Sequence, residues 1–125
     1  MLKKILVVDD ETGFTDALSD VFTARGYAVT AAHDGEEALE KMRGDRPDLV
    51  ILDIMMPKMD GLKVAATLRS DNVLKDVPVV MLTARTEVGD TKQGLELGAA
   101  AYVAKPFRME SLLGIVDGLI GQAAA

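Results

Sequence analysis

The stretch Leu49-Val50-Ile51-Leu52-Asp53 decides the fold, because four apolar residues run without interruption into a single aspartate. Pro57 and then Asp60-Gly61 follow, so the chain has to turn soon after the acid. A short apolar run bounded by turn signals is typical of a strand buried on both faces, as in parallel sheets covered by helices. Ligands of open α/β sheets bind outside the carboxyl ends of the strands. Asp53 is therefore a candidate functional residue, although an aspartate that only starts a turn is the simpler alternative.

Four further segments have the composition of strands. Residues 4–8 form a second apolar run that leads into Asp9-Asp10-Glu11, and residues 27–31 form a shorter, more exposed candidate. Residues 78–83 begin with a proline, which is tolerated at the first position of a strand. Residues 100–104 form the last apolar run. The sequence thus predicts five strands.

Helical periodicity fills the intervals between these strands. The strongest stripe, spaced as on one face of a helix, consists of Phe14, Ala17, Leu18, Val21 and Phe22. Thr12 is its predicted N-cap, and Gly26 lies where a C-terminal capping glycine is expected. Further helices are predicted over residues 35–44, 61–70 and 87–97, and around residues 112–120. Strands that alternate with helices in this way indicate a parallel sheet with helices on both faces.

The composition restricts the class of protein. The chain has 125 residues, near the commonest size of one domain, and we expect residues 1–122 to form that domain and residues 123–125 to be a frayed tail. The absence of cysteine excludes disulfides, thiolate metal sites and cysteine nucleophiles. The net charge of −6 argues against a nucleic-acid surface. Because the sequence contains neither a membrane-length apolar run nor a signal-peptide pattern, we expect a cytoplasmic protein.

Polar residues stand at the carboxyl ends of four predicted strands. Asp9 and Asp10 follow the first strand, Asp53 ends the third, Thr83 ends the fourth and Lys105 follows the fifth. These ends lie on one edge of a parallel sheet, and neighbouring strands are about 4.8 Å apart, so the five side chains can share one site. Each residue alone has an ordinary explanation, as a solvated turn, a helix cap or a surface lysine. Their joint placement favours a functional site.

The chemistry of this set points to phosphoryl transfer. Crowded carboxylates repel one another, and Mg²⁺ removes the repulsion because it accepts carboxylates together with waters and phosphate oxygens. Zn²⁺ is not expected, since cysteine is absent and the lone histidine, His33, is interpreted as a surface residue. Lys105 adds a second positive charge and Thr83 adds a hydroxyl donor. A nucleophile, a cation and fixed donors are what a transferred phosphoryl group requires, and an aspartate can be the nucleophile.

With these residues identified, the sequence resembles the receiver domain of two-component response regulators over essentially its whole length. The matching segments are Val7-Val8-Asp9-Asp10-Glu11, Leu52-Asp53-Ile54-Met55-Met56-Pro57 through Asp60-Gly61, Leu82-Thr83-Ala84, and Tyr102-Val103-Ala104-Lys105-Pro106-Phe107. The resemblance implies a doubly wound, flavodoxin-like or CheY-like fold. That fold has five parallel strands in the order 2-1-3-4-5 and five helices.

The resemblance also implies roles for the site residues. Asp53 would accept a phosphoryl group from the phosphohistidine of a sensor histidine kinase or a phosphotransfer protein. Mg²⁺ would bind to Asp10, Asp53 and the backbone carbonyl of Met55, and Asp9 would act mostly through water. Lys105 would pair with the carboxylate and then with the phosphoryl group. Such a protein catalyses only its own phosphorylation and dephosphorylation.

Thr83 would be the switch hydroxyl of this family and Tyr102 the switch aromatic residue. The switch would change the binding of an unknown downstream protein to the fourth helix, fifth strand and fifth helix, without direct contact to nucleic acid or membrane. The resemblance further implies a cis peptide bond between Lys105 and Pro106, which base rates alone would not predict.

Two positions are expected to set the lifetime of the phosphoryl group. In receivers, the residues two after the phosphoacceptor and two after the switch hydroxyl flank the approach of the attacking water, and here they are Met55 and Arg85. Methionine cannot orient a water molecule, and arginine cannot act as a base. We therefore expect slow intrinsic dephosphorylation.

The sequence departs from the receivers of winged-helix regulators, which share a charged dimer face. The comparable positions here are Ala100, Ala101 and Ile115, so the ion pairs of that dimer cannot form. We therefore expect a stand-alone receiver, and a receiver that is part of a longer regulator is the alternative.

Two other classes of protein share parts of this pattern. A Mg²⁺-dependent phosphatase with an aspartate nucleophile usually has a second acid two residues later, where this sequence has Met55. A flavodoxin-like cofactor binder needs a phosphate-binding loop after the first strand, where Asp9-Asp10-Glu11 would repel a phosphate. The residues therefore favour a signalling receiver over these two classes.

Overall fold

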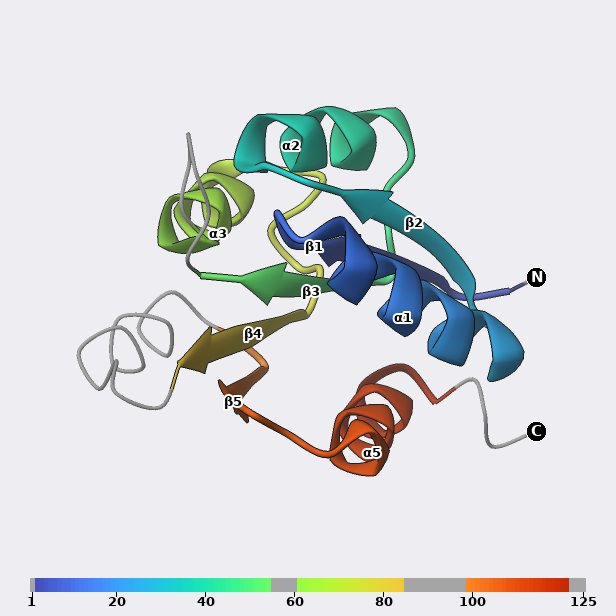
Figure 1. The fold of residues 1–125 in the computed structure, drawn as a ribbon. Helices are drawn as coiled ribbons and strands as arrows, with labels where there is room; N and C mark the ends of the chain where they lie inside the picture. Colours follow the sequence, from blue (N-terminus) through green and yellow to red (C-terminus); the bar gives the residue numbers. More distant parts are fainter. Residues whose placement is uncertain (1, 55–60, 85–98, 122–125) are drawn as a thin grey trace.

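The computed structural model describes residues 2–54, 61–84 and 99–121, and its centre is one parallel sheet (Figure 1). The strands are β1 (Lys4–Val8), β2 (Ala28–Ala32), β3 (Leu49–Asp53), β4 (Val79–Ala84) and β5 (Ala101–Lys105). All neighbouring strands pair in parallel, in the order β2-β1-β3-β4-β5. The fold class and the strand order are therefore confirmed.

Helices cover both faces of the sheet (Figure 1). The described helices are α1 (Thr12–Ala24), α2 (Gly35–Gly44), α3 (Gly61–Ser70) and α5 (Met109–Ile120). The helix predicted over residues 87–97 and the tail predicted over residues 123–125 lie outside the described residues. Within the described part of the chain, no helix has the length and apolarity needed to cross a membrane.

Two apolar cores lie between the sheet and its helices, one on each face of the sheet. Leu6, Val8 and Val50 face α2 and α3, whereas Ile5 and Val7 face α1 and α5. Alternate side chains of a strand point to opposite faces, and both faces of β1 and β3 are covered, so these strands can be apolar throughout. The unbroken run before Asp53 is fully buried, as its composition predicted. β2 and β5 are the edge strands, and β2 is more exposed than β1 or β3.

The start of β2 is displaced by one residue because Tyr27 closes α1 instead of joining the sheet. The N–H of Tyr27 donates to the carbonyl of Phe22, and the N–H of Gly26 donates to Thr23, with Gly26 at φ 102°. These two bonds form a Schellman motif, and the Phe22 and Tyr27 rings make its apolar contact at 5.9 Å. The prediction for Gly26 is thus confirmed, whereas the strand covers residues 28–32 and not 27–31.

Two predictions about α1 are wrong. The helix begins at Thr12, and its N-cap is Glu11, whose carbonyl accepts the N–H groups of Phe14 and Thr15. Ala17 is exposed and not part of the core. Thr15, which the apolar pattern does not include, is buried instead. Its hydroxyl donates to the Thr12 carbonyl at 3.0 Å.

β4 and β5 also begin one residue later than predicted. Pro78 has no N–H to donate to a ladder, and it contributes only its carbonyl, which accepts the N–H of Val50 at 3.0 Å. Ala100 donates to Val79 just before β5 begins. The boundaries of β1, β3, α2 and α3 agree with the prediction.

Candidate functional site

Three carboxylates meet at the carboxyl edge of the sheet. β1 and β3 are neighbours in which Val8 pairs with Leu52, so the residues that follow, Asp9 and Asp53, lie next to each other. One carboxylate oxygen each of Asp9, Asp10 and Asp53 lies within 4.8 Å of the other two. Asp9 is 1% exposed and Asp53 6%, whereas Asp10 is open to solvent. The cluster is therefore buried at Asp9 and Asp53 and open to solvent at Asp10.

Lys105 brings a cation to this cluster from the far end of the sheet. It ends β5, which is separated from β3 by β4, and its side chain reaches back across the strand ends. The Nζ atom lies 3.2 Å from Asp9 Oδ2 and 3.8 Å from Asp53 Oδ2. The following peptide bond, to Pro106, is cis, as the resemblance implied. The site therefore combines one ammonium group with three carboxylates.

Asp9 is held by contacts on both of its oxygens. Oδ1 accepts the N–H of Glu11 at 3.0 Å, and Oδ2 faces Lys105. Its own N–H donates to the Ala32 carbonyl of β2 at 3.1 Å. With both oxygens engaged, Asp9 is suited to act on a cation through water, whereas the exposed Asp10 is open to direct contact.

The residues present fit a magnesium ion. Carboxylates and water are the hard oxygen ligands that Mg²⁺ prefers, at about 2.0–2.1 Å. Two oxygens on opposite sides of one ion are therefore about 4.2 Å apart. One carboxylate oxygen of each residue lies within 4.8 Å of the other two, so two of the carboxylates can approach one ion from different sides. The exposed side of Asp10 leaves room for water ligands.

The remaining predicted residues are placed less completely. Met55 and Arg85 lie outside the described residues. Thr83 is in β4 with its backbone opposite Ala104, and its side chain is not described. Tyr102 packs its ring against the α2–α3 core, and its buried hydroxyl has no hydrogen-bond partner in the structure as described.

His33 lies just after β2 and does not belong to the carboxylate cluster. Its ring Nε2 is 3.2 Å from the Thr15 hydroxyl, and its side chain is 39% exposed. Within the described residues, Asp9, Asp10 and Asp53 form the one group of three or more acidic, histidine or cysteine side chains placed to hold a metal ion.

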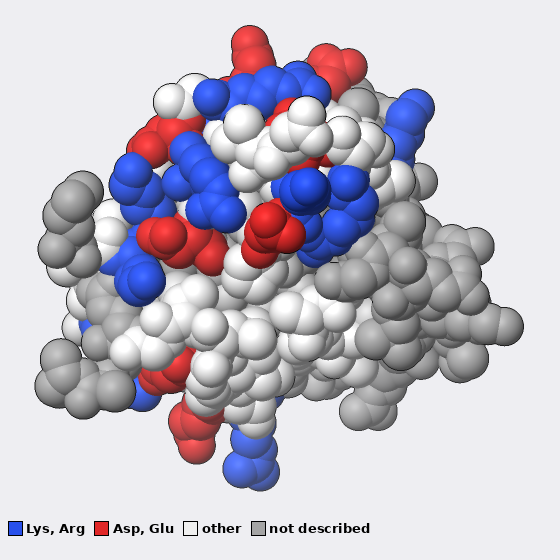
Figure 2. All heavy atoms as spheres, turned by 180° about the vertical axis from the view of Figure 1, so that it is seen from behind, with Lys and Arg blue, Asp and Glu red and all other residues white. Residues whose placement is uncertain are grey.

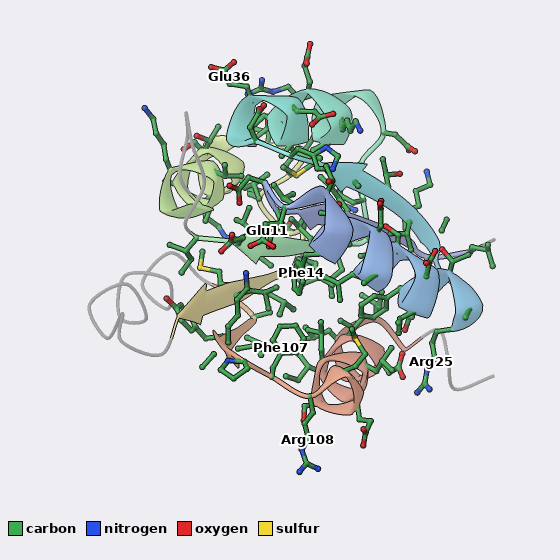
Figure 3. The ribbon with its side chains drawn as sticks, viewed as in Figure 1. Glu11, Phe14, Arg25, Glu36, Phe107 and Arg108 are labelled. Atoms are coloured by element: carbon green, nitrogen blue, oxygen red, sulfur yellow. The ribbon has the colours of Figure 1, made fainter. Side chains whose placement is uncertain are left out.

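Two residues of the site were missed by sequence reasoning. Phe14, which the sequence places only in the core stripe of α1, lies under the Lys105 ammonium group, 4.7 Å from ring centroid to Nζ. Phe14 also meets Phe107 edge to face at 6.1 Å, between α1 and α5 (Figure 3). A cation over an aromatic face is attracted to it, by about 0.5–1 kcal/mol at exposed sites. Phe14 thus helps to fix the ammonium group.

Gly61 is the second missed residue. Its N–H donates to the Ile54 carbonyl at 2.8 Å, which ties the first residue of α3 to the end of β3. A Cβ atom at this position would lie 2.5 Å from the backbone oxygen of Asp53. The sequence indicates only a turn and a helix start at Gly61, and no pattern in it indicates that this glycine packs against Asp53 itself.

The excess of carboxylates should make the metal-free site destabilising. One ammonium group faces three carboxylates, so replacing Asp53 with asparagine removes repulsion while Lys105 keeps its contact with Asp9. We expect Asp53→Asn to raise the free energy of unfolding in Mg²⁺-free buffer by at least about 1 kcal/mol, because two charges 4 Å apart interact by that much even in water and more strongly at a buried position such as Asp53. Thermal unfolding followed by circular dichroism measures it.

The matched control is Asp20→Asn, at an exposed aspartate of α1, which should change the melting temperature little. Millimolar Mg²⁺ should stabilise the wild type more than Asp53→Asn, because it binds the assembled site and hardly the unfolded chain. Identical melting curves of the wild type with and without Mg²⁺ would contradict a preformed metal site.

Comparison with known proteins agrees with this geometry. The family model described as the response regulator receiver domain matches residues 5–117. Among curated proteins, the response regulator MprA of Mycobacterium ulcerans (strain Agy99) is 45% identical over 120 residues, which cover 96% of this chain and 51% of that protein. MprA of Mycobacterium avium (strain 104) is 44% identical over 117 residues, or 94% and 50% of the two proteins. The chain spans about half the length of these relatives.

Solved structures give the same result over the whole fold. The chemotaxis protein CheY4 of Vibrio cholerae has a TM-score of 0.89 at 34% identity, covering 95% of this chain and 99% of that one. A putative response regulator from Chloroflexus aurantiacus has a TM-score of 0.91 at 33% identity, covering 98% and 100%. The chain therefore belongs to the response regulator receiver domain family of two-component signalling systems.

Proposed function

We propose that this receiver accepts a phosphoryl group on Asp53 from a phosphohistidine in a Mg²⁺-dependent reaction. The observation that carries the proposal is the position of Lys105, whose ammonium group lies between buried Asp9 and Asp53 at the edge where three carboxylates meet. A carboxylate nucleophile beside a fixed cation is the arrangement that phosphoryl transfer uses.

In the proposed step, an Asp53 carboxylate oxygen forms a bond to phosphorus as the bond from phosphorus to the donor's imidazole nitrogen breaks. The imidazole leaves with that electron pair and is neutral, because its other nitrogen carries the proton. A magnesium ion on Asp10, Asp53 and the Met55 carbonyl would neutralise phosphoryl charge when bound. Lys105 would move its ion pair from the Asp53 carboxylate to the phosphoryl oxygens, and Phe14 keeps the ammonium group near that position.

Incubation with acetyl phosphate or a phosphorylated histidine kinase, with Mg²⁺ present, tests this function. A receiver gives a lasting label on Asp53, with no turnover of another substrate. A phosphatase gives continued phosphate release, and a cofactor binder gives neither. Met55 and Arg85 offer no group to activate water, so on this proposal the label decays slowly.

The surface beside Lys105 is suited to a protein donor. A recess of about 590 Å³ is lined by Phe14, Ala17, Lys105, Pro106, Phe107 and Met109. Its walls are apolar apart from the lysine, and it lies between α1 and the start of α5. An apolar helix face of a histidine kinase or phosphotransfer protein would fit such a recess and contact the exposed Ala17.

Ala17→Glu should separate protein donors from small donors. The new carboxylate stands in the apolar recess, so we expect phosphoryl transfer from a phosphorylated kinase to slow by about tenfold, a loss of about 1.4 kcal/mol in binding. Acetyl phosphate needs no docked protein, and its labelling rate is the control. Equal slowing with both donors would mean that the substitution disturbs the site itself and not a docking surface.

We further propose that Thr83 and Tyr102 transmit the signal to the face formed by residues 87–97, β5 and α5. The buried hydroxyl of Tyr102 has no hydrogen-bond partner among the described residues, and β5, which carries it, pairs with the strand of Thr83, which supports a role in a rearrangement. Ala100 is exposed, and Ala101 and Ile115 pack partly against the α1–α5 core. The partner of this face is therefore unlike the charged dimer of winged-helix regulators.

Thr83→Ala should uncouple phosphorylation from partner binding. Asp53 is intact in this variant, so it should still be labelled, but without the hydroxyl there is no donor to pull the following segment toward the phosphoryl group. NMR shifts of β5 and α5 on phosphorylation should then be lost, while those of Asp9 and Asp53 remain. The mechanism is wrong if wild-type shifts gather on α1 and α2 instead.

A further inference from the structure

Lys105 is held in the site by two different kinds of contact. Its Nζ atom lies 3.2 Å from Asp9 Oδ2 and 3.8 Å from Asp53 Oδ2. The same atom lies over the Phe14 ring, 4.7 Å from the centroid. Elsewhere on the molecule cations lie beside carboxylates, and Figure 2 shows Lys and Arg side chains among Asp and Glu side chains on the opposite face. The contact with a ring that carries no net charge distinguishes Lys105 from those cations.

The Phe14 ring is fixed by its backbone and by its neighbours. The Phe14 N–H donates to the Glu11 carbonyl at 3.2 Å, and the Glu11 N–H donates to Asp9 Oδ1 at 3.0 Å. The Asp9 carboxylate therefore contacts Lys105 with one oxygen and the first turn of α1 with the other. Phe14 also packs on the α1–α5 core and meets Phe107 edge to face, with an angle of 78° between the rings (Figure 3). The ring position thus depends on protein contacts and not on a ligand.

A metal ion in the cluster would change only one of the two kinds of contact. Without metal, three carboxylates lie around the ammonium group of Lys105. A bound Mg²⁺ would bring two positive charges to these carboxylates, so their net attraction for Lys105 falls and the two cations repel each other. The face of an aromatic ring attracts a cation through its quadrupole, and the ion does not neutralise that attraction. The contact with Phe14 is therefore the one that a metal ion leaves intact.

The metal-bound state is also the one in which the proposed reaction needs the lysine. The phosphoryl donor is anionic and approaches after the cation has bound, and Lys105 then pairs with the phosphoryl oxygens. A released lysine side chain would gain rotamer freedom in solvent, and it would have to lose that freedom again before each transfer. An ammonium group that is already in place avoids this cost.

We propose that Phe14 is a positioning residue that keeps the Lys105 ammonium group in the site while Mg²⁺ occupies the carboxylates. This role rests on the function proposed above, and it allows lysine and metal ion to act together instead of displacing each other. Phe14→Leu removes the ring face but keeps an apolar side chain on the core. In this variant, Mg²⁺ should expel Lys105 from the site.

NMR of the ε-methylene groups of ¹³C-labelled lysine tests the proposal on the unphosphorylated protein. The Lys105 signal is identified by its absence in Lys105→Arg. In the wild type, its relaxation should report a restricted group both without Mg²⁺ and at saturating Mg²⁺. In Phe14→Leu, the group should be restricted without Mg²⁺ and become as mobile as a surface lysine when Mg²⁺ is added. Phe14→Tyr keeps the ring, so its Lys105 relaxation should match the wild type.

Metal affinity and labelling rate should change in opposite directions in Phe14→Leu. Because the ammonium group can leave, Mg²⁺ meets less repulsion and should bind about twofold to threefold more tightly, the range expected from one cation–π contact at a partly exposed site. Labelling by acetyl phosphate at saturating Mg²⁺ should be about threefold slower, because Lys105 has to return before transfer. Amide shifts of Asp9 and Asp10 during a Mg²⁺ titration give the affinity. A general loss of core packing would weaken metal binding as well as labelling.

Phe22→Leu is the matched control, because it makes the same substitution in the same helix and core at a ring that meets Tyr27. It should leave Lys105 relaxation and Mg²⁺ affinity unchanged. The role of Phe14 is excluded if Lys105 stays restricted in Phe14→Leu with Mg²⁺, if it is already mobile in the wild type with Mg²⁺, or if Phe22→Leu gives the same changes. A wild type that takes no label would contradict the proposed function, while the relaxation data would still decide the role of Phe14. Folding of each variant is checked from its amide spectrum.

Discussion

Asp53→Ala should carry no phosphoryl label under conditions in which the wild-type chain is fully labelled. Alanine has no oxygen to attack phosphorus, and neither neighbouring carboxylate can replace it. Asp9 has one oxygen on the Glu11 N–H and the other on Lys105, and Asp10 is directed to solvent. Labelling with radioactive phosphohistidine kinase or acetyl phosphate, followed by intact-mass measurement, gives the result. Undiminished labelling of Asp53→Ala would contradict the proposal that Asp53 is the phosphoacceptor.

The same labelling experiment also tests whether the reaction depends on Mg²⁺. The cluster has three carboxylates and one ammonium group, so an anionic donor meets net negative charge unless a cation binds first. EDTA should therefore block labelling of the wild type, and added Mg²⁺ should restore it. Asp20→Ala, an exposed substitution on α1, is the matched control and should be labelled at the wild-type rate. Rapid labelling in EDTA would show that Asp53 accepts the phosphoryl group without a metal ion.

The sheet was predictable because a strand that is buried on both faces is an uninterrupted run of apolar residues. Residues 5–8 and 49–52 are apolar throughout and reach the end of the strand or the residue before it, so the acids at these ends are placed at the correct edge. Once the strands are parallel, their carboxyl ends share that edge whatever the side chains are. The strand order itself came from the resemblance to a family and not from periodicity.

What the sequence could not predict depends on contacts between distant segments. Tyr27 has the composition of a strand residue, but its N–H is taken by Phe22, so the helix end prevails over the sheet. Ala17 fits the apolar stripe of α1 by spacing alone, yet the recess beside Lys105 leaves it exposed. Phe14 was correctly placed on the inner side of α1, but only the fold shows that Lys105 lies over its ring.

Gly61→Ala should damage both stability and phosphorylation, because the new methyl group has no space. It would lie 2.5 Å from the Asp53 carbonyl oxygen and 2.6 Å from the Ile54 Cα, and both are backbone atoms that cannot rotate away. The end of β3 or the start of α3 must therefore shift. Overpacking of this kind costs about 1–3 kcal/mol, and a displacement of about 1 Å at a reacting group can slow chemistry by about 100-fold.

Two measurements separate these effects. Urea unfolding gives the loss of stability, and labelling by acetyl phosphate at a temperature where both proteins are folded gives the effect on the site. The control is Gly118→Ala in α5, where an added Cβ meets nothing within 4 Å and a gain of up to about 1 kcal/mol in helix propensity is expected. If Gly61→Ala unfolds at the wild-type urea concentration and is labelled as fast, the close packing of Gly61 on Asp53 does not position the nucleophile. Loss of labelling in a variant that is still folded would instead show that the carboxylate depends on a glycine eight residues away, through its backbone and not through any side chain.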